Sequence, residues 1–173
     1  MKTDEKTRKT TIYRVVTMLF LLGWMAVIFW FSDQPAQESS EMSGSVAYRF
    51  VEACSNLFGL GFSEDTTEAY AAAIEHPVRK AAHMTEYAIL GWMFLAALCG
   101  YTPYRRKTVL FALAATAAYA ATDEIHQLFV EGRAGKFSDV CIDTLGALIG
   151  FVLLHIVLLC YGKHCEKQRH PLK

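Results

Sequence analysis

The sequence lacks net charge, because 17 Lys and Arg residues are balanced by 17 Asp and Glu residues. Charged residues are also few, at 20% of the chain, whereas apolar residues make up 53%. This composition argues against an ordinary soluble domain and is typical of a membrane protein with one domain. No nucleic-acid partner is predicted.

The sequence also lacks the motifs of common catalytic sites. It contains no G-x-S-x-G element, no P-loop and no dinucleotide-binding fingerprint. Ser32 and Ser138 are better explained as capping and turn residues than as nucleophiles. The five cysteines are scattered, and none of their spacings with histidine fits a standard zinc site. Whether the protein is an enzyme stays open at this stage.

Helix-length apolar stretches predict an all-α polytopic protein, a bundle of four transmembrane helices. The predicted transmembrane domain covers residues 15–161, with spans at about 15–31, 77–100, 108–128 and 139–161. No charge interrupts the first stretch, and the polar residues after it do not form a signal-cleavage site. We therefore expect an uncleaved anchor rather than a secretory signal.

The distribution of charge predicts the orientation of the spans. Basic residues prevail in the N-terminal segment 1–14, in Arg105-Arg106-Lys107 and in the tail 162–173. By contrast, the segment between the first two spans holds eight acidic residues against two basic ones over residues 33–79. Because positively charged segments remain in the cytoplasm, both termini are expected there.

The long segment before the second span is expected to contain short amphipathic helices. Apolar residues recur at helical spacing over 46–58, and Gly59 and Gly61 provide a stop signal. Asp65 and Glu68 have the spacing of a capping box, which predicts a second short helix towards Glu75. Pro77 would then stand in the first turn of the next helix.

Small residues predict where two spans approach each other closely. Gly146 and Gly150 form a small-xxx-small step in the last span, and the preceding span is rich in alanine over residues 112–121. We therefore expect the third and fourth spans to form a tight hairpin.

Three of the spans carry ionisable residues near the end that is expected to face the outside. A charge inside the hydrocarbon region costs roughly 2.5–3.5 kcal/mol unless it is paired or hydrated. Counting residues along each helix places these groups at a similar depth, and their spacing places them on single helix faces. We therefore expect one polar cavity. Its candidate catalytic or ordering residues are His83, Glu86, Asp123, Glu124, Asp139 and Asp143.

Basic residues around this cavity suggest what it could bind. Arg79, Lys80, Arg133 and Lys136 could form an electropositive mouth for a phosphate or pyrophosphate headgroup. Pairing of these cations with Asp139, Asp143 or Glu124 would explain them equally well. The candidate substrate-binding residues are Arg79, Lys80, His83, Gln127 and Arg133.

A divalent metal held by carboxylates and imidazole is a weaker alternative, because no established ligand spacing is present. Its candidate ligands are Asp123, His126, Asp139 and Asp143. No cofactor is otherwise predicted.

Several stretches together resemble the VanZ-like membrane proteins, a family associated with resistance to the glycopeptide teicoplanin. The stretches run from about residue 29 to 150: WFSDQP, RKAAH with a following EY, TDEIHQLF, GR, SDV and DTLGA. Val130-Glu131 departs from the pattern, since a valine–proline pair is expected before Gly132-Arg133. The resemblance implies a multi-pass protein of the bacterial cytoplasmic membrane, but no established reaction.

The resulting functional hypothesis is a cavity at the outer leaflet that recognises an anionic lipid or cell-wall precursor and influences glycopeptide susceptibility. Membrane lipids and a lipid-linked precursor are the expected partners. One alternative is a membrane-embedded, metal-assisted hydrolase or transferase. Another is a small proton-coupled transporter or flippase, for which four spans offer little room unless the protein forms a homo-oligomer.

Overall fold

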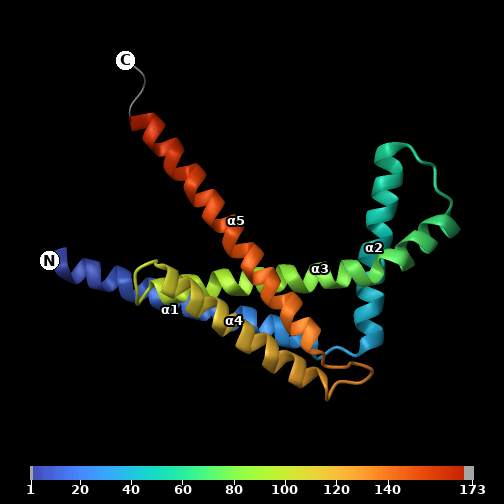
Figure 1. The fold of residues 1–173 in the computed structure, drawn as a ribbon, viewed down its shortest axis with the longest axis horizontal. Helices are drawn as coiled ribbons and strands as arrows, with labels where there is room; N and C mark the ends of the chain where they lie inside the picture. Colours follow the sequence, from blue (N-terminus) through green and yellow to red (C-terminus); the bar gives the residue numbers. More distant parts are fainter. Residues whose placement is uncertain (1, 170–173) are drawn as a thin grey trace.

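The part of the chain that the structure describes folds into five helices, confirming the all-α prediction. The computed structural model describes residues 2–169, with the side chains of residues 5–157. In Figure 1, α1 and α4 run beside α3, α5 crosses α3 at an angle, and α2 lies across one end of α3. The helices are α1 (Lys2–Ser32), α2 (Ala36–Phe58), α3 (Glu64–Cys99), α4 (Arg106–Gln127) and α5 (Phe137–Arg169).

Three of the described helices, α1, α3 and α5, are long and apolar enough to cross a membrane. Large apolar side chains such as Phe20 on α1 and Leu153 on α5 are exposed. Exposed apolar surface of this extent is typical of a lipid-facing helix. The sequence of α4 also reaches helix length, but alanine and threonine dominate it, and it does not reach the hydropathy of the other three.

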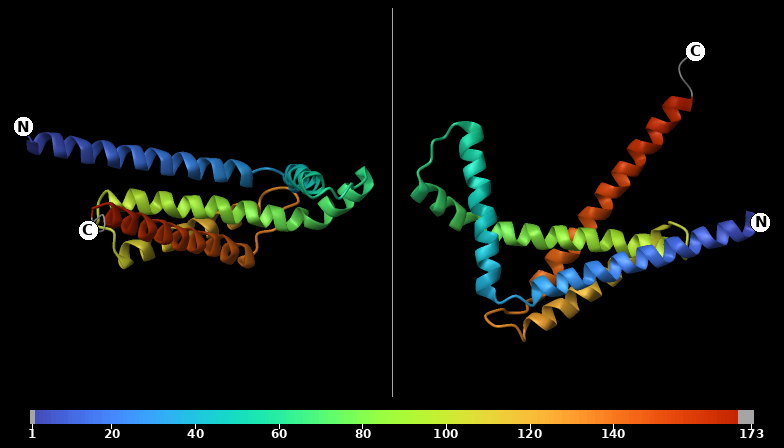
Figure 2. Two further views of the ribbon diagram at one scale, coloured as in Figure 1. Left: turned by 90° about the horizontal axis from the view of Figure 1, so that it is seen from above. Right: turned by 180° about the vertical axis from the view of Figure 1, so that it is seen from behind.

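α2 includes residues 46–58, for which the sequence predicts an amphipathic helix, but it begins ten residues earlier, at Ala36. It ends at Gly59, which adopts the left-handed conformation with φ 64° and donates its N–H to the carbonyl of Ser55. This position favours glycine because a side chain would strain a left-handed backbone. The views in Figure 2 show α2 running across the direction of α1 and α3.

The prediction of a separate short helix from Asp65 to Glu75 is wrong, because α3 continues without interruption through Pro77. The helix begins one residue earlier, with the Ser63 hydroxyl accepting from the Thr66 N–H at 3.3 Å. A proline inside a helix removes one hydrogen bond and usually bends the axis. Figure 1 shows the first part of α3 inclined to the rest.

The predicted partner of the glycines in α5 is also wrong. A Cβ atom on Gly146 would collide with the backbone of Met84, and one on Gly150 would lie 3.0 Å from the Cβ of Ala88. Both neighbours belong to α3, so the glycine face packs on α3 rather than on α4. Trp92 strengthens this crossing by donating its indole N–H to the Gly150 carbonyl at 2.7 Å.

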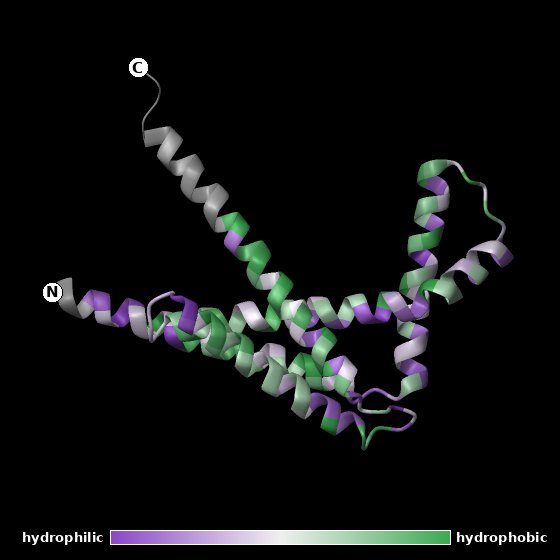
Figure 3. Cartoon of the chain, in the orientation of Figure 1, coloured by the Kyte–Doolittle hydropathy of each residue, from purple (hydrophilic) through white to green (hydrophobic). Residues whose placement is uncertain are grey.

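Polar contacts fix α1 at the two ends of its apolar part. At the start of this part, the Arg14 side chain donates to the Gly100 carbonyl at 2.7 Å, beside the end of α3. Beyond its last residue, the Ala36 N–H donates to the carbonyl of Glu131 at 3.1 Å. The α1–α2 connection is thereby joined to the loop between α4 and α5. Figure 3 shows hydrophilic residues gathered at this corner.

Candidate functional site

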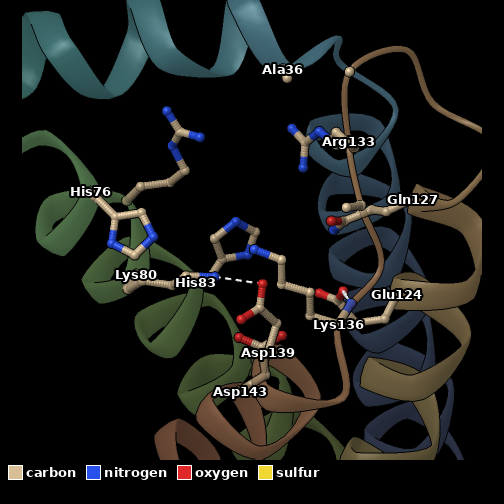
Figure 4. A pocket seen from close by; sticks show the side chains of 13 residues that line it. Ala36, His76, Lys80, His83, Glu124, Gln127, Arg133, Lys136, Asp139 and Asp143 are labelled. Atoms are coloured by element: carbon tan, nitrogen blue, oxygen red, sulfur yellow. Dashed lines mark hydrogen bonds and ion pairs between the residues drawn. The ribbon is translucent and has the colours of Figure 1, made fainter.

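A polar cavity of about 230 Å³ lies at this corner, between α3, α4, the start of α5 and the α4–α5 loop. Figure 4 shows side chains from these elements directed towards one space. All five predicted substrate-binding residues line it, namely Arg79, Lys80, His83, Gln127 and Arg133. Glu124, Asp139 and Asp143 line it as well.

Two of the basic residues in the cavity are paired with carboxylates. The Lys80 ammonium lies 2.6 Å from a carboxylate oxygen of Asp139, an ion pair that is drawn in Figure 4. The Arg79 guanidinium pairs with Glu75 one turn earlier in α3. Arg79 also donates to the hydroxyl of Ser40 at 2.5 Å and thereby holds α2 against α3. Lys80 therefore has one of the partners expected from the sequence, whereas Arg79 pairs with Glu75, which was not among them.

Arg133 is held in a different way. Its Nε donates to the Gln34 carbonyl at 2.7 Å, and its Nη2 donates to the Phe31 carbonyl at 3.0 Å. Within the described side chains, no carboxylate lies within ion-pair distance of Arg133. Burial lowers the pKa of the Arg133 guanidinium, while the more distant Asp123 acts in the opposite direction. The group nevertheless stays cationic, because arginine does not deprotonate in proteins.

The α4–α5 loop positions Arg133 through contacts with the end of α4. The backbone N–H of Lys136 donates to a carboxylate oxygen of Glu124 at 2.8 Å. Gly135 lies so close to the Glu124 carbonyl that any Cβ atom there would collide with it. Gly132, which lines the cavity, has a φ of 71°, a conformation that favours glycine. Two glycines therefore let the loop fold tightly over the cavity.

Asp123 does not line the cavity but lies behind it, with 3% of its surface exposed. One carboxylate oxygen accepts from Ser32 at 2.8 Å, from Tyr87 at 3.1 Å and from Gln127 at 3.3 Å. The other oxygen is buried and has no hydrogen-bond partner within the described chain. This network connects α1, α3 and α4 directly beneath Gln127, so Asp123 acts on the cavity through its neighbours.

The remaining candidates occupy different positions. Glu86 lies outside the polar cavity, and its carboxylate is 4.0 Å from the His83 imidazole, at the limit of an ion pair. His126 also points elsewhere: it stacks on Phe29 with ring centroids 4.3 Å apart and contacts Asp33 at 3.2 Å.

The structure does not bring the four candidate metal ligands together. Asp139 and Asp143 line the cavity, Asp123 is buried behind it, and His126 faces Asp33. Across the described residues, no group of three His, Cys, Asp or Glu side chains is arranged to hold a metal ion. The cysteines and histidines of the tail lie outside the described side chains.

Two parts of the site were missed in the sequence. His76 lines the cavity and lies on the same face of α3 as Arg79, Lys80 and His83. His76 precedes these residues by three, four and seven positions, a helical spacing that could have revealed it. The helix boundary expected at Pro77, however, placed His76 outside the helix that carries the other three. The serines of α2 that contact Arg79 gave no comparable signal, because their role depends on how α2 crosses α3.

A protein-family model described as VanZ/LLP1 matches residues 17–158. The match includes every residue of the cavity and most of the described helices. No curated protein and no solved structure matches the chain.

Proposed function

The chain belongs to the VanZ/LLP1 family, and from this premise we propose that its polar cavity binds the anionic headgroup of a membrane lipid or cell-wall precursor. The observation that carries the proposal is Arg133. Its guanidinium lines the cavity, is oriented by two neutral carbonyl groups and has no carboxylate partner within the described side chains. Arg133 is partly buried, and a partly desolvated cation without a counterion is costly, so a bound anion would offset that cost.

The cavity also offers a suitable set of donors beside Arg133. Lys136 and His83 line the same space, while Gln127 stands at its inner side. Arginine presents several N–H groups in a fixed fork that fits phosphate oxygens, and lysine adds a compact positive charge. The carboxylate of Asp139 neutralises Lys80, so the anion would be held mainly by Arg133 and Lys136.

The proposed setting is the outer face of the bacterial cytoplasmic membrane. α4 serves as a fourth span beside the three apolar helices, and both termini lie in the cytoplasm. This orientation places the basic Arg105-Arg106-Lys107 segment inside and the cavity outside, in agreement with the positive-inside rule. The direction of α2, across α1 and α3, suits a helix that lies along the outer surface.

Binding of an envelope lipid or precursor in this position would alter the access of glycopeptide antibiotics to their targets. We therefore expect expression of the protein to change teicoplanin susceptibility. The other activities predicted from the sequence, metal-assisted hydrolysis and proton-coupled transport, have no comparable supporting observation in the described residues.

The binding proposal is tested with Arg133→Ala in the full-length protein, reconstituted in nanodiscs of a zwitterionic lipid. Hexadecyl phosphate is the probe, and its affinity is measured by titration. We expect Arg133→Ala to weaken binding by roughly tenfold or more, which corresponds to about 1.4 kcal/mol. Arg49→Ala is the matched control, because Arg49 is an exposed arginine on α2 that lines neither described cavity of this corner.

Two readouts separate loss of binding from loss of structure. These readouts are the helix content and the thermal midpoint, which report whether a variant is folded. In Arg133→Lys, which retains the charge, both should stay close to the values of the unaltered protein. Equal affinity in the unaltered protein and in folded Arg133→Ala would refute the proposal. Susceptible strains that express the unaltered protein or Arg133→Ala should then differ in the minimum inhibitory concentration of teicoplanin.

A further inference from the structure

A second cavity, also of about 230 Å³, adjoins the polar one. The two cavities share three lining residues, Arg79, His83 and Arg133. Beyond these side chains the character of the surface changes. Most of the surface of the second cavity is apolar and comes from residues of three elements: Phe31, Met42, Val46, Val78 and Ala82. Gln34, Ser39, Ser43 and Glu86 also line it. Polar and apolar binding surfaces therefore meet at the two arginines and His83.

The apolar cavity opens towards the exposed side of α2. Met42 and Val46 are 48% and 57% exposed, although both line the cavity. They begin an exposed apolar stripe that continues along α2 through Phe50, Ala53 and Leu57 at spacings of three and four residues. A stripe of this kind is suited to the boundary between headgroups and acyl chains.

Among the described residues, this stripe belongs to no buried cluster. A different face of α2, with Ala47 and Val51 buried, packs on Ala71 of α3. The Arg79 side chain donates hydrogen bonds to the hydroxyls of Ser40 and Ser43, and these bonds hold α2 over α3. α2 is thus fixed in place by one face, while its exposed apolar face leads directly into the second cavity.

From this geometry we infer that the ligand is an amphiphile with a phosphate-class headgroup in the polar cavity and one apolar chain in the cavity between α2 and α3. The inference rests on the proposed function and specifies its ligand class. The chain would enter sideways from the outer leaflet, along Met42 and Val46. A cavity of about 230 Å³ is smaller than the pockets that hold drug-sized ligands, so it accommodates part of one chain.

Charge and polarity both select this ligand over the alternatives. A free phosphate would leave the apolar surface exposed to water. A neutral lipid would leave Arg133 without a counterion, because the described residues offer it only carbonyl partners. A lipid phosphate satisfies both surfaces at once.

The test compares hexadecyl phosphate with ethyl phosphate, which carries the same headgroup without a long chain. Ala82→Trp fills the apolar cavity from α3, where Ala82 is exposed enough to accept a larger side chain. We expect it to weaken binding of hexadecyl phosphate by at least tenfold and to leave ethyl phosphate binding unchanged. Ala81→Trp is the matched control, because Ala81 is the exposed neighbour that does not line the cavity, and it should change neither affinity.

A second pair of variants provides the same test if Ala82→Trp does not fold. Val46→Trp fills the cavity from α2, and Ala53→Trp lies on the same exposed stripe beyond it. Val46→Trp should reproduce the selective loss, and Ala53→Trp should not.

The outcomes distinguish this inference from the proposal on which it rests. If Arg133→Ala weakens both phosphates while Ala82→Trp and Val46→Trp weaken neither, the headgroup site stands and the chain site is refuted. Equal binding of hexadecyl and ethyl phosphate to the unaltered protein would refute the chain site as well. If Arg133→Ala has no effect on either probe, the proposed function itself fails.

Discussion

At the scale of the residue, two charged groups organise the corner, a buried carboxylate at Asp123 and a partly buried guanidinium at Arg133. Asp123 is surrounded by three donors from three helices, whereas Arg133 is oriented by backbone carbonyls and faces a cavity. The buried carboxylate therefore stabilises the junction of α1, α3 and α4. The arginine, without a carboxylate partner in the described region, is the group left available for an anion.

The role of Asp123 can be measured by removing one donor. Tyr87 is fully buried, and its hydroxyl donates to Asp123 at 3.1 Å. Tyr87→Phe should destabilise the protein by about 1–3 kcal/mol, because the buried carboxylate loses a partner. The measurement is the thermal midpoint in detergent. Tyr70→Phe is the control, since Tyr70 is an exposed tyrosine of the same helix, and an equal midpoint in both variants would contradict the assigned network.

The sequence predicts the residues of the cavity better than their roles. Periodicity on one helix face grouped Arg79, His83 and Glu86, of which Arg79 and His83 line the cavity. Chain geometry placed Asp143 at the same depth, and it also lines the cavity. Spacing alone could not show that Asp123 lies behind the cavity or that His126 faces Asp33. Those positions depend on the rotation of α4 about its axis, which is set by packing against α1 and α3.

At the scale of the element, the structure departs from the sequence-based expectation in α3 and α5. Pro77 favours a helix boundary by local chemistry, but Ala47 and Val51 of α2 pack on the segment before it and stabilise a continuous helix. Likewise, Gly146 and Gly150 correctly indicate a close helix crossing without indicating the partner. Tertiary packing decides both cases, and a local pattern does not report it.

The crossing of α3 and α5 predicts the effect of adding one methyl group. Gly146→Ala should destabilise the protein by about 1–3 kcal/mol, because the new Cβ atom collides with the backbone of Met84 and forces the helices apart. The thermal midpoint in detergent is the measurement. Gly23→Ala is the matched control, since a Cβ atom there meets nothing within 4 Å, and this variant should be neutral or stabilised. A harmless Gly146→Ala would contradict the described crossing.

At the scale of the whole molecule, the polar cavity and the amphipathic α2 fit the proposed orientation in a membrane. The Arg14 and Gly100 contact lies at the start of the apolar part of α1, and the α1–α2 connection joins the α4–α5 loop just beyond the other end. If three or four helices span the bilayer, these two ends face opposite sides of it. The cavity belongs to the side that also carries α2.

The proposed orientation is tested by cysteine labelling in intact cells, in a variant whose native cysteines are replaced. Ser45→Cys places a thiol on the exposed surface of α2, and Thr102→Cys places one in the exposed α3–α4 connection. A membrane-impermeant reagent should label position 45 from outside and position 102 only after permeabilisation. The reverse pattern would place the cavity at the cytoplasmic side and exclude the proposed ligand source.

Native mass spectrometry of the full-length protein, released from the membrane in a mild neutral detergent, tests the central claim most directly. The cavity built around Arg133 predicts a retained lipid whose mass and fragmentation identify a phosphate-bearing headgroup, and predicts its loss in Arg133→Ala but not in Arg49→Ala. Retention of zwitterionic lipid alone, or equal retention of the anionic lipid by both variants, would contradict the account.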